Sequence, residues 1–264
     1  MKHTLLSSLP QDHPWGKRIY CYDTLPSTNT LAKELAAKGA QEGTVIIARE
    51  QTGGRGRLGR SFSSPAGLGL YLSVILRPNC KPEKLMHLTC AAGVAGADAI
   101  EKAVGFRPGI KWANDLVWGK QKLGGILTEL GFDAAGNVCW AVVGIGINCA
   151  HTPEDFPEDI RSVAASLSMA SGKAIAPMDL TACLIPALAQ MAENLFDAKE
   201  VMARYRCDCI TLGQNVCVVR GDTLRYGKAL EVADDGALTV EFSDGHTETV
   251  TCGEVSVRGM YGYV

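Results

Sequence analysis

The chain has 264 residues, with 26 Lys and Arg against 28 Asp and Glu, which gives a formal net charge of −2. Hydrophobic residues make up 47% and charged residues 20%, a balance that favours a packed core and excludes collagen, a coiled coil or a disordered chain. No apolar run reaches the roughly 18 residues that a membrane span needs, and the apolar stretch within residues 1–10 is too short for a signal peptide.

In the first third of the chain, residues 19–25, 44–50 and 68–76 are rich in β-branched and aromatic residues and predict three strands. Between the first two, residues 27–39 predict a helix, with hydroxyl groups to cap its start and a glycine to end it. A long loop rich in Gly, Ser and Arg is expected at 51–67.

The middle of the chain predicts one helix followed by three consecutive strands. Residues 82–104 are rich in Ala, and their Leu and Ala side chains recur at helical spacing. Strands are expected at 110–118, 122–132 and 138–148, and the last two are joined by a hairpin turn at 133–137.

The pattern then becomes helical, with a short helix at 162–169 and a long one at 177–205. Pro186 lies within the long helix and is expected to kink it or to break it in two. From residue 211 onward, five short strands alternate with Asp-Gly turns and predict a small β barrel. We therefore expect an α+β protein with a domain boundary near 207–212.

The near-zero net charge conceals an asymmetry. Residues 49–60 contain four arginines and one glutamate, whereas residues 207–264 contain four basic and nine acidic side chains. Nucleic-acid-binding proteins spread positive charge over a whole face. A short basic loop better suits one small anionic ligand.

The basic loop contains Gly54-Arg-Gly-Arg-Leu-Gly59, which formally matches the dinucleotide-binding pattern GxGxxG. That pattern must open a helix, and the residues that follow here are not a helix start. Glycines let a backbone fold closely over a phosphate, and arginine forks bind phosphate oxygens. We interpret the loop as a phosphate-binding segment; the alternative is a solvated, flexible loop.

Polar side chains interrupt the predicted strand at 110–118. Lys111, Asn114 and Asp115 lie among apolar residues, where unpaired polar groups are costly, and strand alternation would put Lys111 and Asp115 on one face. A strand end at a binding site would explain them, and so would a polar edge strand.

Two glycine pairs occur in the next strands. Lys122 precedes Gly124-Gly125, and residues 144–148 read Gly-Ile-Gly-Ile-Asn. Glycines clear a sheet face for a ligand or another backbone, although simple sheet packing is an alternative. Cations around such a face, without a Ser-His-Asp arrangement, favour phosphoryl or adenylyl transfer.

The ten cysteines are scattered, mostly in apolar runs and without a CxxC pair. Free thiols behave as small hydrophobic side chains, and reduced thiols are typical of intracellular proteins, so we expect buried thiols and a cytoplasmic location. Cys207 and Cys209 are a weak signal for zinc. Cys149 and His151 are a weak signal for a nucleophilic pair, because no third group in the sequence orients them.

Taken together, five motifs resemble the biotin–protein ligases: PSTN at 26–29, GRGRLGR at 54–60, KWANDL at 111–116, KLGGILTE at 122–129 and GIGIN at 144–148. The resemblance spans about residues 19–150, and the β-rich tail is consistent with it. One departure is Ala113, where the family often has proline.

The resemblance implies a mixed-sheet catalytic domain related to class II aminoacyl-tRNA synthetases, here 1–206, and a small SH3-like β barrel, here 207–264. It implies that biotin and MgATP give biotinyl-5′-AMP and pyrophosphate, and that biotin then passes to a lysine of a biotin carboxyl carrier domain. Only about 18 residues precede the first strand, too few for the DNA-binding module of some members. We therefore expect no nucleic-acid or membrane partner; a homodimer is left open.

The resemblance also implies residue roles. The catalytic side chains would be Lys122, Arg55 and Arg57. The biotin-binding residues would be Ser27, Thr28, Asn29, Gln51, Arg55, Gly56, Arg57, Lys122, Gly124 and Gly125. The ATP-binding residues would be Lys111, Asn114, Asn148, Arg57 and Arg60. Asp115 would bind Mg²⁺ or water, or form a structural ion pair.

Two alternatives remain open. Another acyl-adenylating ligase on the same fold, such as a lipoate–protein ligase, would share the chemistry but not the acid. A sensor of biotin or adenylate would bind the ligand without releasing pyrophosphate. Arg55, Arg57 and Lys122 argue against the sensor.

Overall fold

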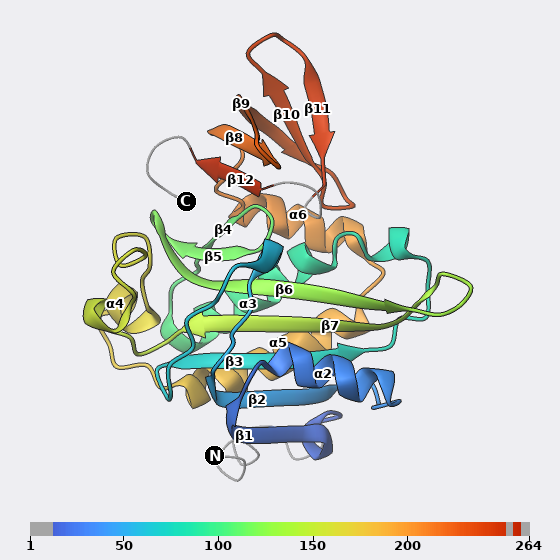
Figure 1. Cartoon of the computed structure of the whole chain (residues 1–264), viewed down its shortest axis with the longest axis vertical. Coiled ribbons are helices and arrows are strands. Elements are labelled where there is room, and N and C mark those ends of the chain that lie inside the picture. The colour runs from blue at the N-terminus through green and yellow to red at the C-terminus, as the bar shows by residue number, and fades with distance from the viewer. Residues whose placement is uncertain (1–12, 252–255, 260–264) are drawn as a thin grey trace.

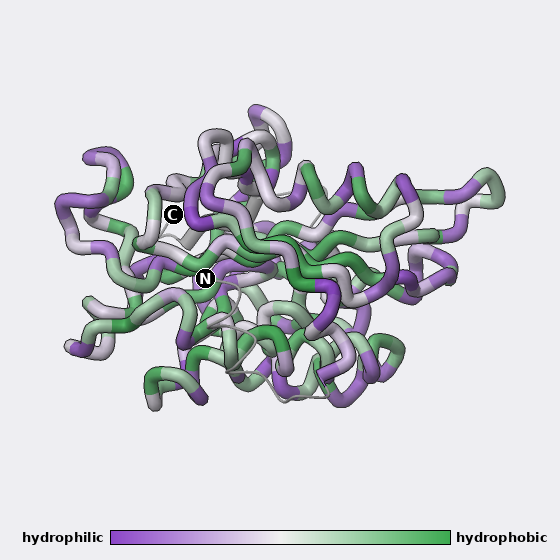
Figure 2. The backbone as a smooth tube through the Cα atoms, turned by 90° about the horizontal axis from the view of Figure 1, so that it is seen from below, coloured by the Kyte–Doolittle hydropathy of each residue, from purple (hydrophilic) through white to green (hydrophobic). Residues whose placement is uncertain are grey.

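The computed structural model describes residues 13–251 and the backbone of 256–259. A seven-stranded sheet and its helices form a large unit, and a five-stranded sheet lies at one end of it (Figure 1). The hydrophobic stretches run through the middle of the molecule, and the hydrophilic ones concentrate in peripheral loops (Figure 2). The expected coarse organisation, a mixed sheet followed by a smaller β unit, is confirmed.

The large sheet has the strand order β1-β2-β3-β7-β6-β5-β4. β1 and β2 are parallel, and every other neighbouring pair is antiparallel. The strands are β1 (Ile19–Leu25), β2 (Thr44–Gln51), β3 (Gly69–Leu76), β4 (Gly109–Lys111), β5 (Asp115–Trp118), β6 (Gln121–Phe132) and β7 (Val138–Asn148). The sequence-based strands in β1, β2, β3, β6 and β7 are confirmed.

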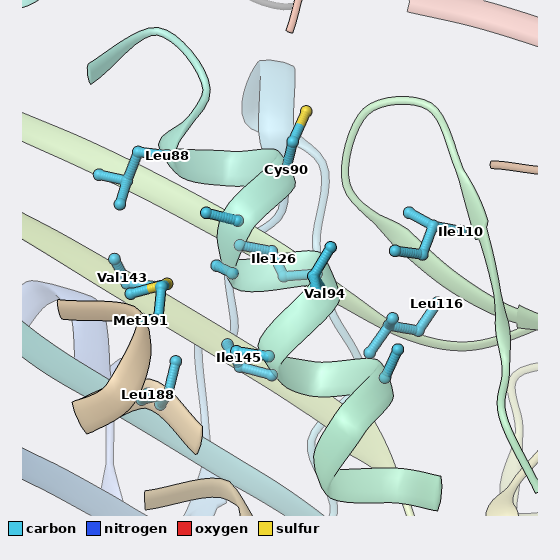
Figure 3. Packing of buried hydrophobic residues seen from close by; sticks show 14 of the residues in the cluster. Leu88, Cys90, Val94, Ile110, Leu116, Ile126, Val143, Ile145, Leu188 and Met191 are labelled. Atoms are coloured by element: carbon cyan, nitrogen blue, oxygen red, sulfur yellow. The ribbon is translucent and has the colours of Figure 1, made fainter. Parts of the chain in front are cut away.

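Helices cover the two faces of this sheet unequally. α2 (Thr28–Ala37) packs on β2, β3 and β7 through Ala32 and Ala36. α3 (Leu88–Val104) and α5 (Pro177–Glu193) cover the opposite face (Figure 1). The main core lies under α3, where Val94 of the helix and Ile126 and Ile145 of the sheet belong to one buried cluster (Figure 3). Because α2 is short, it leaves part of the sheet face on which it packs uncovered.

The prediction of one strand at 110–118 is wrong. The chain forms a tight hairpin instead, in which Lys111 of β4 pairs with Asp115 of β5. The turn residues have their own partners: Trp112 donates its backbone N–H to Thr211 Oγ1 (2.9 Å) and its indole N–H to the Gly236 carbonyl (2.9 Å). These bonds hold Trp112 in a turn and away from a strand ladder, so the alternation expected for a continuous strand does not apply.

Of the kink or break expected at Pro186, the break is wrong. α5 continues through Pro186, and its neighbours Leu184 and Ile185 are fully buried in the core. The long helix ends later, where Asn194 bonds back to the Gln190 carbonyl and Asp197 caps α6 (Ala198–Asp208). Polar caps, rather than the proline, set the boundary between the two helices.

Two further helix predictions needed adjustment. The segment expected as one helix from residue 82 begins as a 3₁₀ turn, Pro82–Leu85, before α3 starts at Leu88. The short helix α4 (Leu167–Ser171) starts later than the expected residue 162, because Ser166 caps it by accepting from the Met169 N–H.

The C-terminal sheet is antiparallel, with the order β11-β10-β9-β8-β12. Its strands are β8 (Asn215–Arg220), β9 (Thr223–Val232), β10 (Leu238–Phe242), β11 (Thr247–Val250) and β12 (Ser256–Gly259). The five predicted strands and the Asp-Gly turns at 235–236 and 244–245 are confirmed. Arg206 of α6 ties this sheet to the large unit by bonding the Val232 carbonyl and pairing with Asp234.

In the part of the chain that the structure describes, no helix is both long and apolar enough to cross a membrane. The cysteines of that part are all free, and they include the buried Cys209 beside the exposed Cys207. No cluster of three metal-ligating side chains occurs among the described residues, which gives the CxC pair no zinc site there.

Two buried histidines are expected to make stability depend on pH. Burial lowers the pKa of both His87 and His151 below 6.5. The two imidazoles therefore bind protons more readily in the unfolded chain than in the native chain. The contribution of the two histidines to stability is complete above pH 6.5 and is lost as the pH falls below it. We expect the melting temperature to drop between about pH 7 and about pH 5.

The drop should be smaller in His151→Phe, which removes the titrating ring but keeps a ring stacked on Phe156. His246→Gln, at an exposed turn, serves as the control and should leave the drop unchanged. An equal pH dependence in His151→Phe and the wild type, measured by thermal melting, would contradict this account.

Candidate functional site

A cavity lies on the α2 face of the large sheet, between the start of α2, the 51–65 loop, the β4–β5 turn and the middle of β6 and β7. Its lining includes thirteen of the predicted site residues: Ser27, Thr28, Asn29, Gln51, Arg55, Gly56, Arg57, Arg60, Lys111, Asn114, Asp115, Lys122 and Gly125. Residues that are far apart in the sequence, from 27 to 146, therefore line one cavity.

The glycines of the cavity floor seat side chains of the protein itself. A methyl group at Gly144 would lie 2.0 Å from Asn29 Oδ1, and one at Gly146 would lie 2.7 Å from the Phe62 ring. A methyl group at Gly125 would lie 3.3 Å from Lys122 Nζ. Each of these positions accepts a side chain that lines the cavity, which is closer to the packing alternative than to a face cleared for a ligand or another backbone.

A buried polar network arranges the start of α2. Ser73 of β3 is fully buried, and its Oγ lies 2.6 Å from Asn29 Oδ1 and 2.8 Å from Thr28 Oγ1. Gln51 Oε1 accepts from both the backbone N–H and the hydroxyl of Thr28. Ser27 occupies the N-cap position but makes no side-chain cap bond. The Gln51 side chain, rather than the expected hydroxyl cap, therefore accepts the backbone N–H of Thr28 at the start of the helix.

The basic loop folds onto the sheet. Phe62 donates its backbone N–H to the Gly54 carbonyl, and a methyl group at Gly54 would lie only 2.2 Å from the Phe62 carbonyl oxygen. Only a residue without a side chain fits there. The segment opens no α-helix, which excludes the dinucleotide-binding pattern.

Two arginines attach the loop to the residues around the cavity. Arg55 lies 3.3 Å from Glu129 of β6, and Arg57 donates to Asn114 Oδ1 at 2.9 Å. Asn114 in turn donates its amide to the Ile126 carbonyl at 3.1 Å. The loop is thus joined to β6 directly through Arg55 and indirectly through the β4–β5 turn.

Positive charge dominates the cavity. Among the described residues, its lining carries the single carboxylate of Asp115 and five cationic side chains, Arg55, Arg57, Arg60, Lys111 and Lys122. Lys122 Nζ lies 2.7 Å from Asp115 Oδ1, so the ion-pair alternative for Asp115 is observed. Lys111 is 6% exposed. This excess of cations suits an anionic ligand.

Two predicted site residues lie outside the cavity lining. A methyl group at Gly124 would lie 2.4 Å from the Gly146 carbonyl oxygen, which indicates close strand packing. Asn148 is buried and donates its amide to the Ala165 carbonyl at 3.0 Å. The observed contacts of both residues are with the protein itself.

The Cys149–His151 pair is not a catalytic arrangement. Burial raises the pKa of the Cys149 thiol to about 12, so the thiolate is absent at neutral pH. The His151 ring is buried, and it stacks on Phe156 at a centroid distance of 4.8 Å.

Sequence reasoning missed three residues of the site: Ser73, Phe62 and Glu129. Ser73 is a lone polar residue in an apolar strand, which is the same signal that pointed to Lys111. Glu129 ends the KLGGILTE motif, in which the lysine and the glycines are the stronger signals. Phe62 had no distinguishing signal within its loop.

The comparisons with known proteins agree with this geometry. Residues 21–148 match the Biotin/lipoate A/B protein ligase family, and residues 211–258 match the Biotin protein ligase C terminal domain. The chain is 36% identical over 238 residues to the bifunctional ligase/repressor BirA of Bacillus subtilis, covering 87% of this chain and 71% of that protein. The chain belongs to the biotin protein ligase family.

Other members of the biotin protein ligase family support this placement. The biotin--[acetyl-CoA-carboxylase] ligase of Paracoccus denitrificans is 30% identical over 238 residues, with 88% of this chain and 98% of that protein covered. The biotin protein ligase of Aquifex aeolicus, solved in complex with biotin and ATP, superposes with a TM-score of 0.78 at 26% identity, over 92% of this chain and 99% of that one.

The contact between Gly144 and Asn29 generates a prediction. A methyl group at residue 144 forces Asn29 out of its place, and overpacking of this kind costs about 1–3 kcal/mol. We expect Gly144→Ala to lower the free energy of unfolding by about that amount in urea denaturation. Gly16→Ala is the matched control, because a methyl group there meets open space. Equal losses in both variants would show that the contact with Asn29 is not the cause.

Proposed function

We propose that the chain is an ATP-dependent biotin protein ligase. In the first step, the biotin carboxylate attacks the α-phosphorus of ATP, which gives biotinyl-5′-AMP and pyrophosphate. In the second step, the amine of a specific lysine on a biotin carboxyl carrier domain attacks the acyl carbon and releases AMP. The observation that carries this proposal is a single cavity with hydroxyl and amide groups at the α2 end and five cations around its rim.

The polar end of the cavity suits the ureido ring of biotin. We assign Ser27, Thr28, Asn29 and Gln51 to it, because their hydroxyl and amide groups offer fixed donors and acceptors. Three glycines would let the backbone lie close to the bound acid. Gly56 and Gly125 line the cavity, and Gly124 is next to Gly125 in β6.

The cationic end suits the reacting groups. We assign Lys122, Arg55 and Arg57 to the biotin carboxylate and the α-phosphate. Lys111, Asn114, Arg57 and Arg60 would bind the nucleotide, and Asn148 would support this side from beneath. The attacking carboxylate and the triphosphate repel each other, and one cation about 4 Å away offsets about 1 kcal/mol in water and about 4 kcal/mol at an effective dielectric near 20.

The donor set is consistent with Mg²⁺ brought in by the nucleotide. Asp115 is the one carboxylate that the described residues contribute to the cavity lining, and Lys122 already pairs with it. Mg²⁺ commonly takes one or two protein carboxylates and completes its shell with phosphates and water. When bound, the ion would neutralise phosphate charge, and Asp115 would be its protein ligand.

The proposed enzyme has two domains. We assign residues 1–206 to a catalytic domain related to class II aminoacyl-tRNA synthetases and residues 207–264 to an SH3-like barrel; α6 ends at Asp208, two residues past this boundary. The acceptor would be a biotin carboxyl carrier domain, and the reaction would take place in the cytoplasm. A lipoate ligase is the alternative, but the matched biotin-specific C-terminal domain favours biotin.

The deciding experiment is biotin-dependent release of pyrophosphate, followed by transfer of labelled biotin to a carrier domain. We expect release with biotin and none with lipoate. Release with lipoate alone would replace the proposal by the lipoate ligase. Tight binding of biotin with no pyrophosphate release would identify a sensor.

Lys122 provides the sharpest single-residue test. Removal of one preorganised cation from the reacting centre costs about 100-fold or more in rate. We expect Lys122→Ala to lower pyrophosphate release at saturating biotin and ATP by at least this factor. Lys120→Ala, an exposed lysine two residues away, is the matched control and should retain wild-type release. Normal release by Lys122→Ala would remove the assigned role.

Arg57 is expected to retain the intermediate. Its guanidinium joins the loop to Asn114, so Arg57→Gly loosens the loop over the adenylate. We expect biotinyl-5′-AMP to leave the variant faster, measured by filtration of the preformed complex, with a smaller effect on the melting temperature because loops contribute little to the core. A lower melting temperature with unchanged adenylate release would contradict the assignment.

A further inference from the structure

Glu129 receives donors from three separate positions of the site. Its Oε1 lies 2.6 Å from Lys33 Nζ of α2 and 3.3 Å from Arg55 of the loop. Its Oε2 accepts from Asn29 Nδ2 at 3.0 Å. Glu129 is absent from the lining of the cavity itself. It therefore acts through its neighbours rather than on a bound ligand.

The carboxylate of Glu129 stays ionised. Burial raises its pKa, but hydrogen bonds from Lys33 and Asn29 and the nearby charge of Arg55 outweigh burial and hold the pKa below its ordinary value. An ionised carboxylate accepts hydrogen bonds and donates none. The group that faces Glu129 from Asn29 must therefore be the amide N–H₂, not the amide oxygen.

The remaining contacts of Asn29 complete this orientation. Nδ2 donates its second hydrogen to the Leu127 carbonyl at 3.1 Å, so both amide hydrogens are in use. Oδ1 lies 2.6 Å from Ser73 Oγ, directly above Gly144. An amide oxygen has two acceptor positions, and the one left over is the only hydrogen-bonding capacity that Asn29 still offers. The residue is presented to the cavity as an acceptor.

We propose that Glu129 is a positioning residue which holds the Asn29 amide in this one orientation, so that Asn29 recognises an N–H group of the ligand. The inference rests on the proposed function and sharpens it, because the ureido ring of biotin carries two N–H groups. A ligand with a hydrogen-bond acceptor in place of these N–H groups would bind more weakly, because two acceptor atoms would then face each other. Selectivity for a ring N–H would thus originate in a carboxylate that does not touch the ring.

Glu129→Gln tests the orientation directly. A glutamine offers both a donor and an acceptor, so either orientation of Asn29 becomes possible. The measurement is the Kd, by calorimetry without ATP, of biotin and of two analogues in which one or the other ureido N–H is replaced by N–CH₃ or oxygen. A merely structural role would weaken biotin and the analogues alike and leave their ratio unchanged.

In the wild type we expect at least one analogue to bind about tenfold or more weakly than biotin, because a buried acceptor loses its partner. In Glu129→Gln the ratio should fall towards one, mainly through weaker binding of biotin. Lys33→Gln is the matched control: it removes an ion pair from the same carboxylate but leaves the Asn29 bond, so selectivity should persist.

Should Glu129→Gln fail to fold, Glu129→Asp keeps the charge and draws the carboxylate back from Asn29 by one methylene, and the same loss of selectivity is expected. Unchanged selectivity in the folded variants, while the wild type binds biotin and releases pyrophosphate, would overturn the assignment of Glu129 alone. A wild-type chain that binds no biotin would remove the proposed function as well.

Discussion

The contact between Asn29 and the bare backbone of Gly144 is the constraint on which the site depends. It lets the first turn of α2 sit directly on β7, where any side chain at 144 would displace it. Ser73 on one neighbouring strand and the Leu127 carbonyl on the other then bond the same amide. Three adjacent strands thus determine the position of one side chain, and a rigid sheet is a better support for a binding group than a loop.

The same principle extends along the floor of the cavity. Phe62 lies over Gly146, and Lys122 lies beside Gly125. The glycines do not leave an empty surface; they lower the floor so that functional side chains stand where a β-carbon would otherwise be. The cationic groups are then held by few acids, chiefly Asp115 and Glu129. The net positive charge of the cavity therefore remains available to an anion.

The sequence predicted most of this arrangement because its signals were local. Gly, Arg and Lys at the motif positions indicate backbone freedom and positive charge, and the glycines at 125, 144 and 146 leave room for side chains of the site. The role of Ser73 depends on side chains 44 and 45 residues away, which no periodicity reveals. Residue 148 sits in a motif, yet the fold turns its amide towards Ala165.

The two wrong element predictions have a common physical cause. Between 110 and 118 the apolar alternation favours one strand, but partners from the C-terminal part of the chain hold Trp112 in a turn. At Pro186 the local rule favours a break, but burial of Leu184 and Ile185 keeps the helix continuous. In each case tertiary contacts outweighed a local preference that is worth only a few kcal/mol.

The Trp112 contacts also bear on how the two sheets cooperate. The turn that follows Trp112 carries Asn114, which receives Arg57 of the loop. The same turn is fixed from outside by Thr211 and by the Gly236 carbonyl, and Gly236 itself packs against the start of α3 at Cys90. The C-terminal part of the chain therefore stabilises the turn on the cationic side of the cavity. The two sheets are separate in the topology, but the hydrogen bonds that shape the site join them.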